Sequence, residues 1–234
     1  MLTSQGGGGT FGVLTKVTIR TIPTPKLAVY NFTLQTAPNA TAYWDSLAYL
    51  LAQYPALSAA NVSAFTYLFP NITPPAGGTP IASFQAVLAL PDPTSATELE
   101  DLWAPFWKHI NETSPGQITT SATSTVFPDL YSMFLEYADA STAGVDKVVG
   151  SWLLPADTLT DEDFKDTLMT FLGESGGRLY MVSGKGVWDA EPRGGGDAVN
   201  PAWRKALVHA GMSCWLTEKR DANIRSDFSE LDPA

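Results

Sequence analysis

The chain has 234 residues, of which 44% are hydrophobic and 16% charged, a composition typical of a folded globular protein. Its 14 basic and 24 acidic residues give a net charge of -10, which would repel a nucleic-acid backbone. No apolar run reaches the roughly 20 residues of a membrane-spanning helix. We therefore expect neither a nucleic-acid partner nor a membrane segment.

Two sequence patterns predict the elements of the first half of the chain. Alternating apolar residues predict strands at 11–22, 27–34, 63–69 and 81–90. Apolar residues at three- and four-residue steps predict helices at 40–54, ended by Pro55, and at 94–110. Thr94 or Ser95 is the expected N-cap of the second helix.

The second half is less regular. The Ser- and Thr-rich segment 114–129 fits either an edge strand or a loop, and 201–215 fits either a strand or a helix. Strands are expected at 145–154 and 179–183, and a glycine-rich loop at 184–200. A helix ending at Gly173 is expected to begin with a capping box from Thr160 to Asp163. Because the connections have hairpin length, we predict an α+β fold: an antiparallel sheet with helices packed on one face.

Few residues suggest chemistry on their own. The single cysteine, Cys214, excludes an intrachain disulfide and any multi-cysteine metal site, and we expect no metal. His209 could act as a base, but a packed or surface histidine is the favoured interpretation. No catalytic residue is therefore assigned. The aromatic residues fit either a ligand pocket or the core.

Acceptor sequences for N-linked glycans are more frequent than chance predicts. Five of the seven asparagines open an N-x-S/T sequence, whereas roughly one match is expected in a chain of this Ser and Thr content. This excess predicts a secreted glycoprotein, although residues 1–5 contain no signal peptide. The predicted glycosylation sites are Asn31, Asn39, Asn61, Asn71 and Asn111.

The glycine run at 6–9 has two interpretations. Glycines can let backbone N–H groups approach a pyrophosphate. A dinucleotide-binding fingerprint, however, requires a strand before the glycines and a helix after them, and here a strand is predicted to follow. A linker is the alternative.

Two segments carry a family resemblance. Residues 6–23, which begin GGGGTFGVLT, resemble GGGGTFGVVTSVTVKAHP in the FAD-linked oxidoreductases of the berberine bridge enzyme-like group. Residues 184–210, with the sequence NPAWR at 200–204, are similar to an element of fungal members. The resemblance implies FAD as cofactor and an antiparallel sheet that lies over the isoalloxazine ring. It also implies flavin contacts from Gly7, Gly8, Gly9, Thr10, Phe11, Gly12 and Val13.

The resemblance also implies a domain organisation and an activity. Residues 1–15 would close the flavin domain, 16–217 would form the substrate domain, and 218–234 would lead toward a C-terminal segment. We expect oxidation of a hydrophobic small molecule with O2 as acceptor, but no activity from this chain alone, because the main flavin domain has no counterpart in it. The face that packs on that domain could then mediate association. A stand-alone binding module and a non-redox cyclase are the alternatives.

Overall fold

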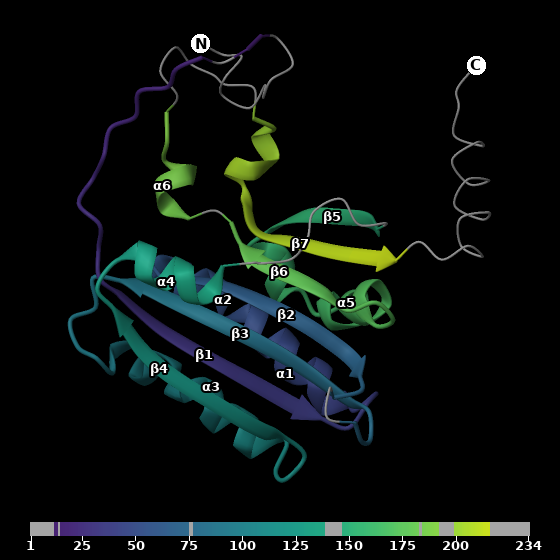
Figure 1. The fold of residues 1–234 in the computed structure, drawn as a ribbon. Helices are drawn as coiled ribbons and strands as arrows, with labels where there is room; N and C mark the ends of the chain where they lie inside the picture. The colour runs from purple at the N-terminus through teal and green to yellow at the C-terminus, as the bar shows by residue number, and fades with distance from the viewer. Residues whose placement is uncertain are drawn as a thin grey trace, which may run out of the picture.

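A computed structural model describes residues 12–13, 15–74, 77–138, 147–182, 184–191 and 199–215. These residues form a seven-stranded sheet of order β4-β1-β3-β2-β6-β7-β5, in which every neighbouring pair is antiparallel (Figure 1). The strands are β1 (Leu27–Thr36), β2 (Ser63–Ile72), β3 (Ile81–Pro91), β4 (Thr119–Phe127), β5 (Lys147–Pro155), β6 (Gly177–Met181) and β7 (Ala206–Trp215). The predicted α+β class is confirmed.

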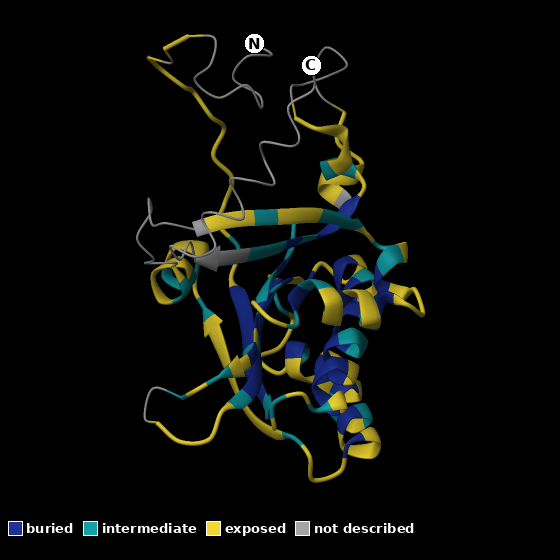
Figure 2. Ribbon diagram, turned by 90° about the vertical axis from the view of Figure 1, so that its right-hand side faces the viewer, coloured by how far each residue is buried: buried dark blue, intermediate teal, exposed yellow. Residues whose placement is uncertain are grey.

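Most helices cover one side of this sheet, which we call the helix face. Figure 2 shows the buried residues concentrated between the sheet and these helices. The helices are α1 (Thr41–Ala52), α2 (Tyr54–Ala59), α3 (Glu98–Thr113) and α5 (Phe164–Leu172), and a separate helix, α4 (Leu130–Tyr137), lies across the opposite side. A short helix, α6 (Lys185–Trp188), and 3-10 turns at Asp157–Thr160 and Pro201–Arg204 complete the described elements.

Aromatic packing dominates the core under the helix face. Phe32 of β1 is 1% exposed and its ring lies 5.6 Å from Trp103 and 5.7 Å from Phe106, both on α3. Phe84 of β3 meets the same ring edge-on. These rings are buried because every second residue of a strand points to the same face and α3 is amphipathic.

Buried hydroxyls on the helix face are paired. The Tyr54 hydroxyl lies 2.6 Å from the Thr66 hydroxyl, and the Tyr43 hydroxyl donates to the Ser83 carbonyl at 3.1 Å. Burial raises the pKa of both tyrosines well above the ordinary value, since the phenolate form would lose its hydration. Each hydrogen bond offsets the desolvation of a polar group inside the core.

Helix boundaries differ from the sequence prediction at prolines and caps. Pro55 does not end the helical region; it occupies the first turn of α2, where its missing N–H costs nothing. The second helix begins at Glu98, whose carboxylate accepts from the backbone and hydroxyl of Thr94. The predicted capping box at Thr160 is wrong, because that hydroxyl donates to the Asp157 carbonyl instead.

The strand predicted at 11–22 is also wrong for the residues described. Residues 15–26 are extended but form no strand, and Ile19 and Ile22 are 77% and 78% exposed. Their alternating pattern finds no partner in the described sheet, although the edge strands β4 and β5 each have one unpaired side there. Period-two alternation thus does not by itself specify a pairing partner.

The two undecided segments both become strands. The Ser- and Thr-rich segment supplies β4 at one edge of the sheet, and β7 pairs with both β5 and β6. The small polar residues of β4 are almost all exposed, as an edge strand without a covering layer allows. The strands predicted at 27–34, 63–69, 81–90, 145–154 and 179–183 are confirmed with shifted ends.

Candidate functional site

The side of the sheet opposite the helix face, which we call the open face, carries the chemically versatile side chains. Strand register aligns Phe65 of β2 with Tyr180 of β6, and Tyr180 with His209 of β7. Two residues along β2, Tyr67 lies opposite Arg178. Because paired residues in antiparallel strands point to the same face, these five side chains share one surface.

Helix α4 covers one end of the open face. Its Met133 and Tyr137 pack on the small apolar cluster Leu27, Val29, Val87 and Ala89. The helix begins at Asp129, whose carboxylate accepts from the Ser132 backbone N–H at 2.7 Å. This N-cap bond fixes the start of α4, and the four-residue spacing of Met133 and Tyr137 turns both toward the sheet.

A cavity of about 300 Å³ lies between α4 and strand β6, and we call it the central cavity. Its size is at the lower end of the range for small-molecule sites. Aromatic and apolar groups form most of its wall, and no described residue of the wall is charged. The lining residues are Ser63, Ala64, Phe65, Tyr67, Ala89, Met133, Tyr137, Tyr180 and Met181.

A second, smaller cavity of about 90 Å³ adjoins the central cavity at Tyr180. We call it the small cavity. Arg178, Tyr180 and His209 line it together, beside backbone and apolar atoms of β5 and β7. It therefore combines a cation, a phenol and an imidazole within a largely apolar wall. The His209 ring is held from outside by Trp203, at a centroid distance of 5.3 Å.

The electrostatics of this cluster keep Tyr180 protonated. Partial burial, together with a hydrogen bond between the Tyr180 and Tyr67 hydroxyls, raises the pKa of Tyr180 to about 12, and the Arg178 guanidinium opposes this shift. At neutral pH the phenol is therefore a neutral hydrogen-bond donor and acceptor. His209 brings its imidazole nitrogens to the same small cavity.

A side-chain hydrogen bond joins β1 and β3 beneath α4. Gln85 of β3 donates to the Asn31 side-chain oxygen at 2.9 Å, across the β1–β3 pair. The Asn31 side chain also bonds the Tyr137 hydroxyl, while burial raises the pKa of that tyrosine. Asn31 thus connects the sheet to α4 next to the central cavity.

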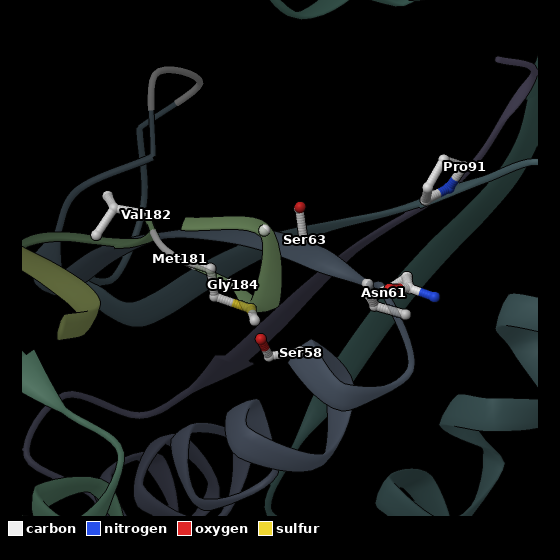
Figure 3. A pocket seen from close by; sticks show the side chains of 9 residues that line it. Ser58, Asn61, Ser63, Pro91, Met181, Val182 and Gly184 are labelled. Atoms are coloured by element: carbon white, nitrogen blue, oxygen red, sulfur yellow. The ribbon is translucent and has the colours of Figure 1, made fainter. Parts of the chain in front are cut away.

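A third cavity, of about 320 Å³, lies at the end of the sheet where β2 starts and β6 stops, and we call it the end cavity. Figure 3 shows Ser58 with its hydroxyl turned toward Met181 and Gly184. The wall is richer in small polar groups than that of the central cavity. Its lining residues are Ser58, Asn61, Val62, Ser63, Pro91, Met181, Val182, Gly184 and Gly186.

Of the residues implied to contact FAD, the structure describes Gly12 and Val13. Gly7, Gly8, Gly9, Thr10 and Phe11 lie outside the described residues. Gly12 and Val13 are exposed, and a Cβ placed on Gly12 would meet no atom within 4 Å. These two described residues therefore form no enclosed site for a diphosphate. What fits FAD is the open face, whose aromatic and hydrogen-bonding groups suit the edge or plane of a flat ring.

The predicted glycosylation sites differ in environment. Asn39, Asn61, Asn71 and Asn111 are exposed, the first two in turns with φ of 60° and 62°. Asn31 is half-buried in the middle of β1 and engaged by Gln85. Glycan attachment stays a prediction at all five.

Metal-ligand and membrane features are not found in the part of the chain that the structure describes. No group of three or more His, Cys, Asp or Glu side chains is placed there to hold a metal ion. None of the described helices has the length and apolar character needed to cross a bilayer. The side chain of Cys214 is not among those described.

Sequence reasoning missed Tyr67, Arg178 and Tyr180 as site residues and ranked His209 low. A period-two signal was present, since Tyr67 and Tyr180 each sit two residues from another open-face side chain. The order of the strands in the sheet could not be predicted from the sequence, because β2, β6 and β7 are separated in the chain and become adjacent only in the sheet. Helix α4 was missed as well, although Asp129 and Ser132 form its cap.

Comparison with protein-family models gives no match. Among curated proteins, an uncharacterised FAD-linked oxidoreductase of Arthroderma benhamiae is 30% identical over 97% of this chain and 38% of its own length. The FAD-linked oxidoreductase easE of Epichloe festucae var. lolii is 26% identical over 86% of the chain and 32% of its own length. The chain thus spans about a third of the length of the curated relatives it matches.

Solved structures share the fold. The VAO-type flavoprotein MtVAO713 from Myceliophthora thermophila C1 aligns with a TM-score of 0.69 at 18% identity, over 85% of this chain and 37% of its own. The VAO-type flavoprotein MtVAO615 from the same organism gives 0.60 at 17% identity, over 86% of this chain and 36% of its own. The curated matches are oxidoreductases linked to FAD, and the structural ones are flavoproteins. The chain therefore belongs to the fungal FAD-linked oxidoreductases of the berberine bridge enzyme-like family, whose cofactor is FAD.

Proposed function

We propose that the open face forms the substrate wall of an FAD-dependent oxidase that acts on a hydrophobic small molecule, with O2 as the final acceptor. The observation that carries this proposal is the row formed by Phe65, Tyr180 and His209 across three strands. It puts an apolar ring, a neutral phenol and an imidazole beside two connected cavities. FAD, when bound, supplies the hydride acceptor of such a reaction.

The residues of the face have separate roles in this proposal. Phe65 and Met133 bind the apolar body of the substrate and exclude water from it. Tyr180, kept neutral by its raised pKa, donates a hydrogen bond to the oxygen or nitrogen of the reacting group and orients it. His209 takes the proton that this group loses as it is oxidised.

We also propose that these 234 residues alone hold FAD poorly and consume no O2. The described residues offer a ring-binding surface, and Gly12 and Val13 form no enclosed site for a diphosphate. Free FAD should therefore bind the chain with an affinity as weak as that of lumiflavin, the isoalloxazine ring with a methyl group in place of the ribityl, diphosphate and adenosine chain. If the diphosphate had its own site, FAD would bind far more tightly than lumiflavin.

Fluorescence titration of the purified full chain with lumiflavin and with FAD tests the proposal. We expect Tyr180→Ala to weaken lumiflavin binding at least about fivefold, the effect of losing roughly 1 kcal/mol of contact. Ser121→Ala, on exposed β4, is the matched control and should change nothing. Near-stoichiometric FAD carried through purification would contradict the claim of weak binding, and lumiflavin binding unaffected by Tyr180→Ala would contradict the assignment of the face.

A non-redox role is the second candidate, as a binding module or a cyclase. The observation that favours it is that residues of this chain alone form an apolar cavity large enough for a small molecule. In that case a hydrophobic phenol should bind the face without competition from lumiflavin. Competition between the two supports the oxidoreductase proposal instead.

Secretion and glycosylation remain part of the proposed function. Four acceptor asparagines are exposed, whereas a glycan on Asn31 would break its bond with Gln85 and obstruct the floor beneath α4. We propose that the folded chain carries glycans at Asn39, Asn71 and Asn111 but not at Asn31, nor at Asn61, which lines the end cavity. Peptide mass spectrometry of the chain expressed through a fungal secretory pathway checks this, and an occupied Asn31 or Asn61 in folded protein would refute it.

Association through an uncovered surface is the remaining proposal. Leu130, Tyr131, Phe134 and Leu135 on the outer side of α4 are all more than half exposed. Such a patch favours contact with another apolar surface. Sedimentation of the full chain should therefore show concentration-dependent association that weakens in a Phe134→Ser variant; a monomer at all concentrations would refute it.

A further inference from the structure

The three cavities lie in a row. The small cavity and the central cavity share Tyr180, and the central cavity and the end cavity share Ser63 and Met181. The shared residues make these cavities neighbours, and the end cavity lies at the end of the sheet, where Ser58 of α2 faces the start of β2. The row runs from the β5–β7 side of the sheet, past α4, to the point where β2 starts.

The chemistry of the wall changes along this row. Aromatic and thioether groups dominate the central cavity, with Phe65, Tyr137 and Met133 as its main surfaces. The end cavity instead presents the Ser58 and Ser63 hydroxyls and a glycine-rich backbone edge. The described lining residues of both carry no charge. A ligand that fills both therefore matches an apolar body followed by a neutral polar end.

Two glycines keep the end cavity open. A Cβ added at Gly184 would lie 3.6 Å from the Ser58 hydroxyl, and one added at Gly186 would meet nothing within 4 Å. Neither glycine is required by a left-handed backbone or by close packing. A Cβ at Gly186, which lines the end cavity, would therefore meet no steric obstacle.

We propose that the substrate of the open face is elongated: its apolar or aromatic body occupies the central cavity, and an uncharged hydroxyl- or amide-bearing end reaches the end cavity. The inference rests on the proposed function only in placing the reacting group near Tyr180. Ser58 binds the polar end, and Met181 and Ser63 border the passage between the two cavities. The end cavity thus acts as a specificity site remote from the reacting atoms.

Three phenols of matched body serve as probes. Para-butylphenol has the body alone, para-(hydroxybutyl)phenol adds a neutral hydroxyl, and para-(carboxypropyl)phenol ends in a carboxylate. Their affinities for the full chain are measured by titration. We expect the hydroxyl-ended probe to bind about fivefold tighter than para-butylphenol, as one net hydrogen bond provides.

Variants of the end cavity test its contribution to the preference for the hydroxyl-ended probe. Gly186→Leu should abolish the fivefold preference while leaving the affinity for para-butylphenol within about twofold. Ser58→Ala should reduce the preference, and Ser121→Ala on β4 should not. Equal binding of the first two probes, or a preference that survives Gly186→Leu, would overturn the proposal. Tighter binding of the carboxylate-ended probe would overturn its claim of a neutral end.

Failure of the proposed function gives a different pattern. If the open face is not the binding wall, Tyr180→Ala will leave the affinity for para-butylphenol unchanged. If only the extension into the end cavity is wrong, Tyr180→Ala will weaken all three probes alike, and Gly186→Leu will have no effect on their ratio. Circular dichroism of each variant shows that it retains its fold.

Discussion

The two faces of the sheet are built from the same strands but stabilised in different ways. On the helix face, Phe32 and Phe84 are at most 1% exposed and every neighbour is a packed ring or aliphatic group. On the open face, Phe65 and Tyr180 are only partly buried, and cavities adjoin them. The packing on the helix face therefore stabilises the fold, whereas the open face leaves room for a ligand.

The largest difference between the faces should appear when a ring is removed from each. Phe32→Ala deletes a ring that contacts Tyr30, Trp103 and Phe106, and we expect a loss of about 3–5 kcal/mol in the free energy of unfolding. The matched change Phe65→Ala should cost less than about 2 kcal/mol, because that side chain is only partly buried. Urea unfolding of both variants checks this, and equal losses would mean that the open face is part of the core.

Hydroxyl removal gives a second, smaller contrast. Tyr54→Phe leaves the fully buried Thr66 hydroxyl without its partner and should cost about 1–3 kcal/mol. Tyr180→Phe should change stability by less than about 1 kcal/mol but weaken phenol binding. In a Tyr54→Phe, Thr66→Val double variant the loss should be smaller than the sum of the single losses. If the two losses of stability are additive, the hydrogen bond between Tyr54 and Thr66 does not contribute to stability.

Alkaline pH should separate the same two tyrosines. Both have a pKa raised in the folded state, so the folded chain holds more protons than the unfolded one and stability falls as pH rises. The contribution of Tyr180 is fully present below pH 10 and is lost between pH 10 and about 12. The free energy of unfolding, measured across this pH range, should fall less steeply in Tyr180→Phe than in the unchanged chain. Tyr54→Phe should also remove a loss of stability, one that begins at the same pH and extends to higher pH. Unchanged slopes in both would contradict the shifts.

The smallest effect is expected at the solvent side of the helix layer. Lys165 on α5 meets Asp45 on α1 at 2.9 Å, but both side chains are substantially exposed. Lys165→Met should therefore cost less than about 1 kcal/mol at low salt and nothing at high salt. Lys108→Met, next to Glu112 at 3.9 Å within α3, is the control. A loss larger than that of Tyr54→Phe would reverse the ranking.

Much of the fold was predictable because local patterns and tertiary packing agreed. Alternation in β1 and β3 matched strands buried on the helix face, and the spacing of Leu99, Trp103 and Phe106 matched an amphipathic α3. Prediction failed where a pattern had no partner, as at Ile19 and Ile22, and where small polar residues allowed either state, as in β4. The site was the least predictable part, since no motif marks Tyr67, Arg178 or Tyr180.

The sequence by itself determined the α+β class, the antiparallel pairing of strands joined by short connections, as in β2 and β3, and the resemblance to FAD-linked oxidoreductases. These depend on residue periodicity and short connections, which act locally along the chain. The tertiary structure decided that β2, β6 and β7 lie side by side, that α4 covers the opposite side from the other long helices, and that three cavities follow one another. Those features depend on which distant strands pair, because a strand's pattern specifies which face is buried but not which neighbour it meets.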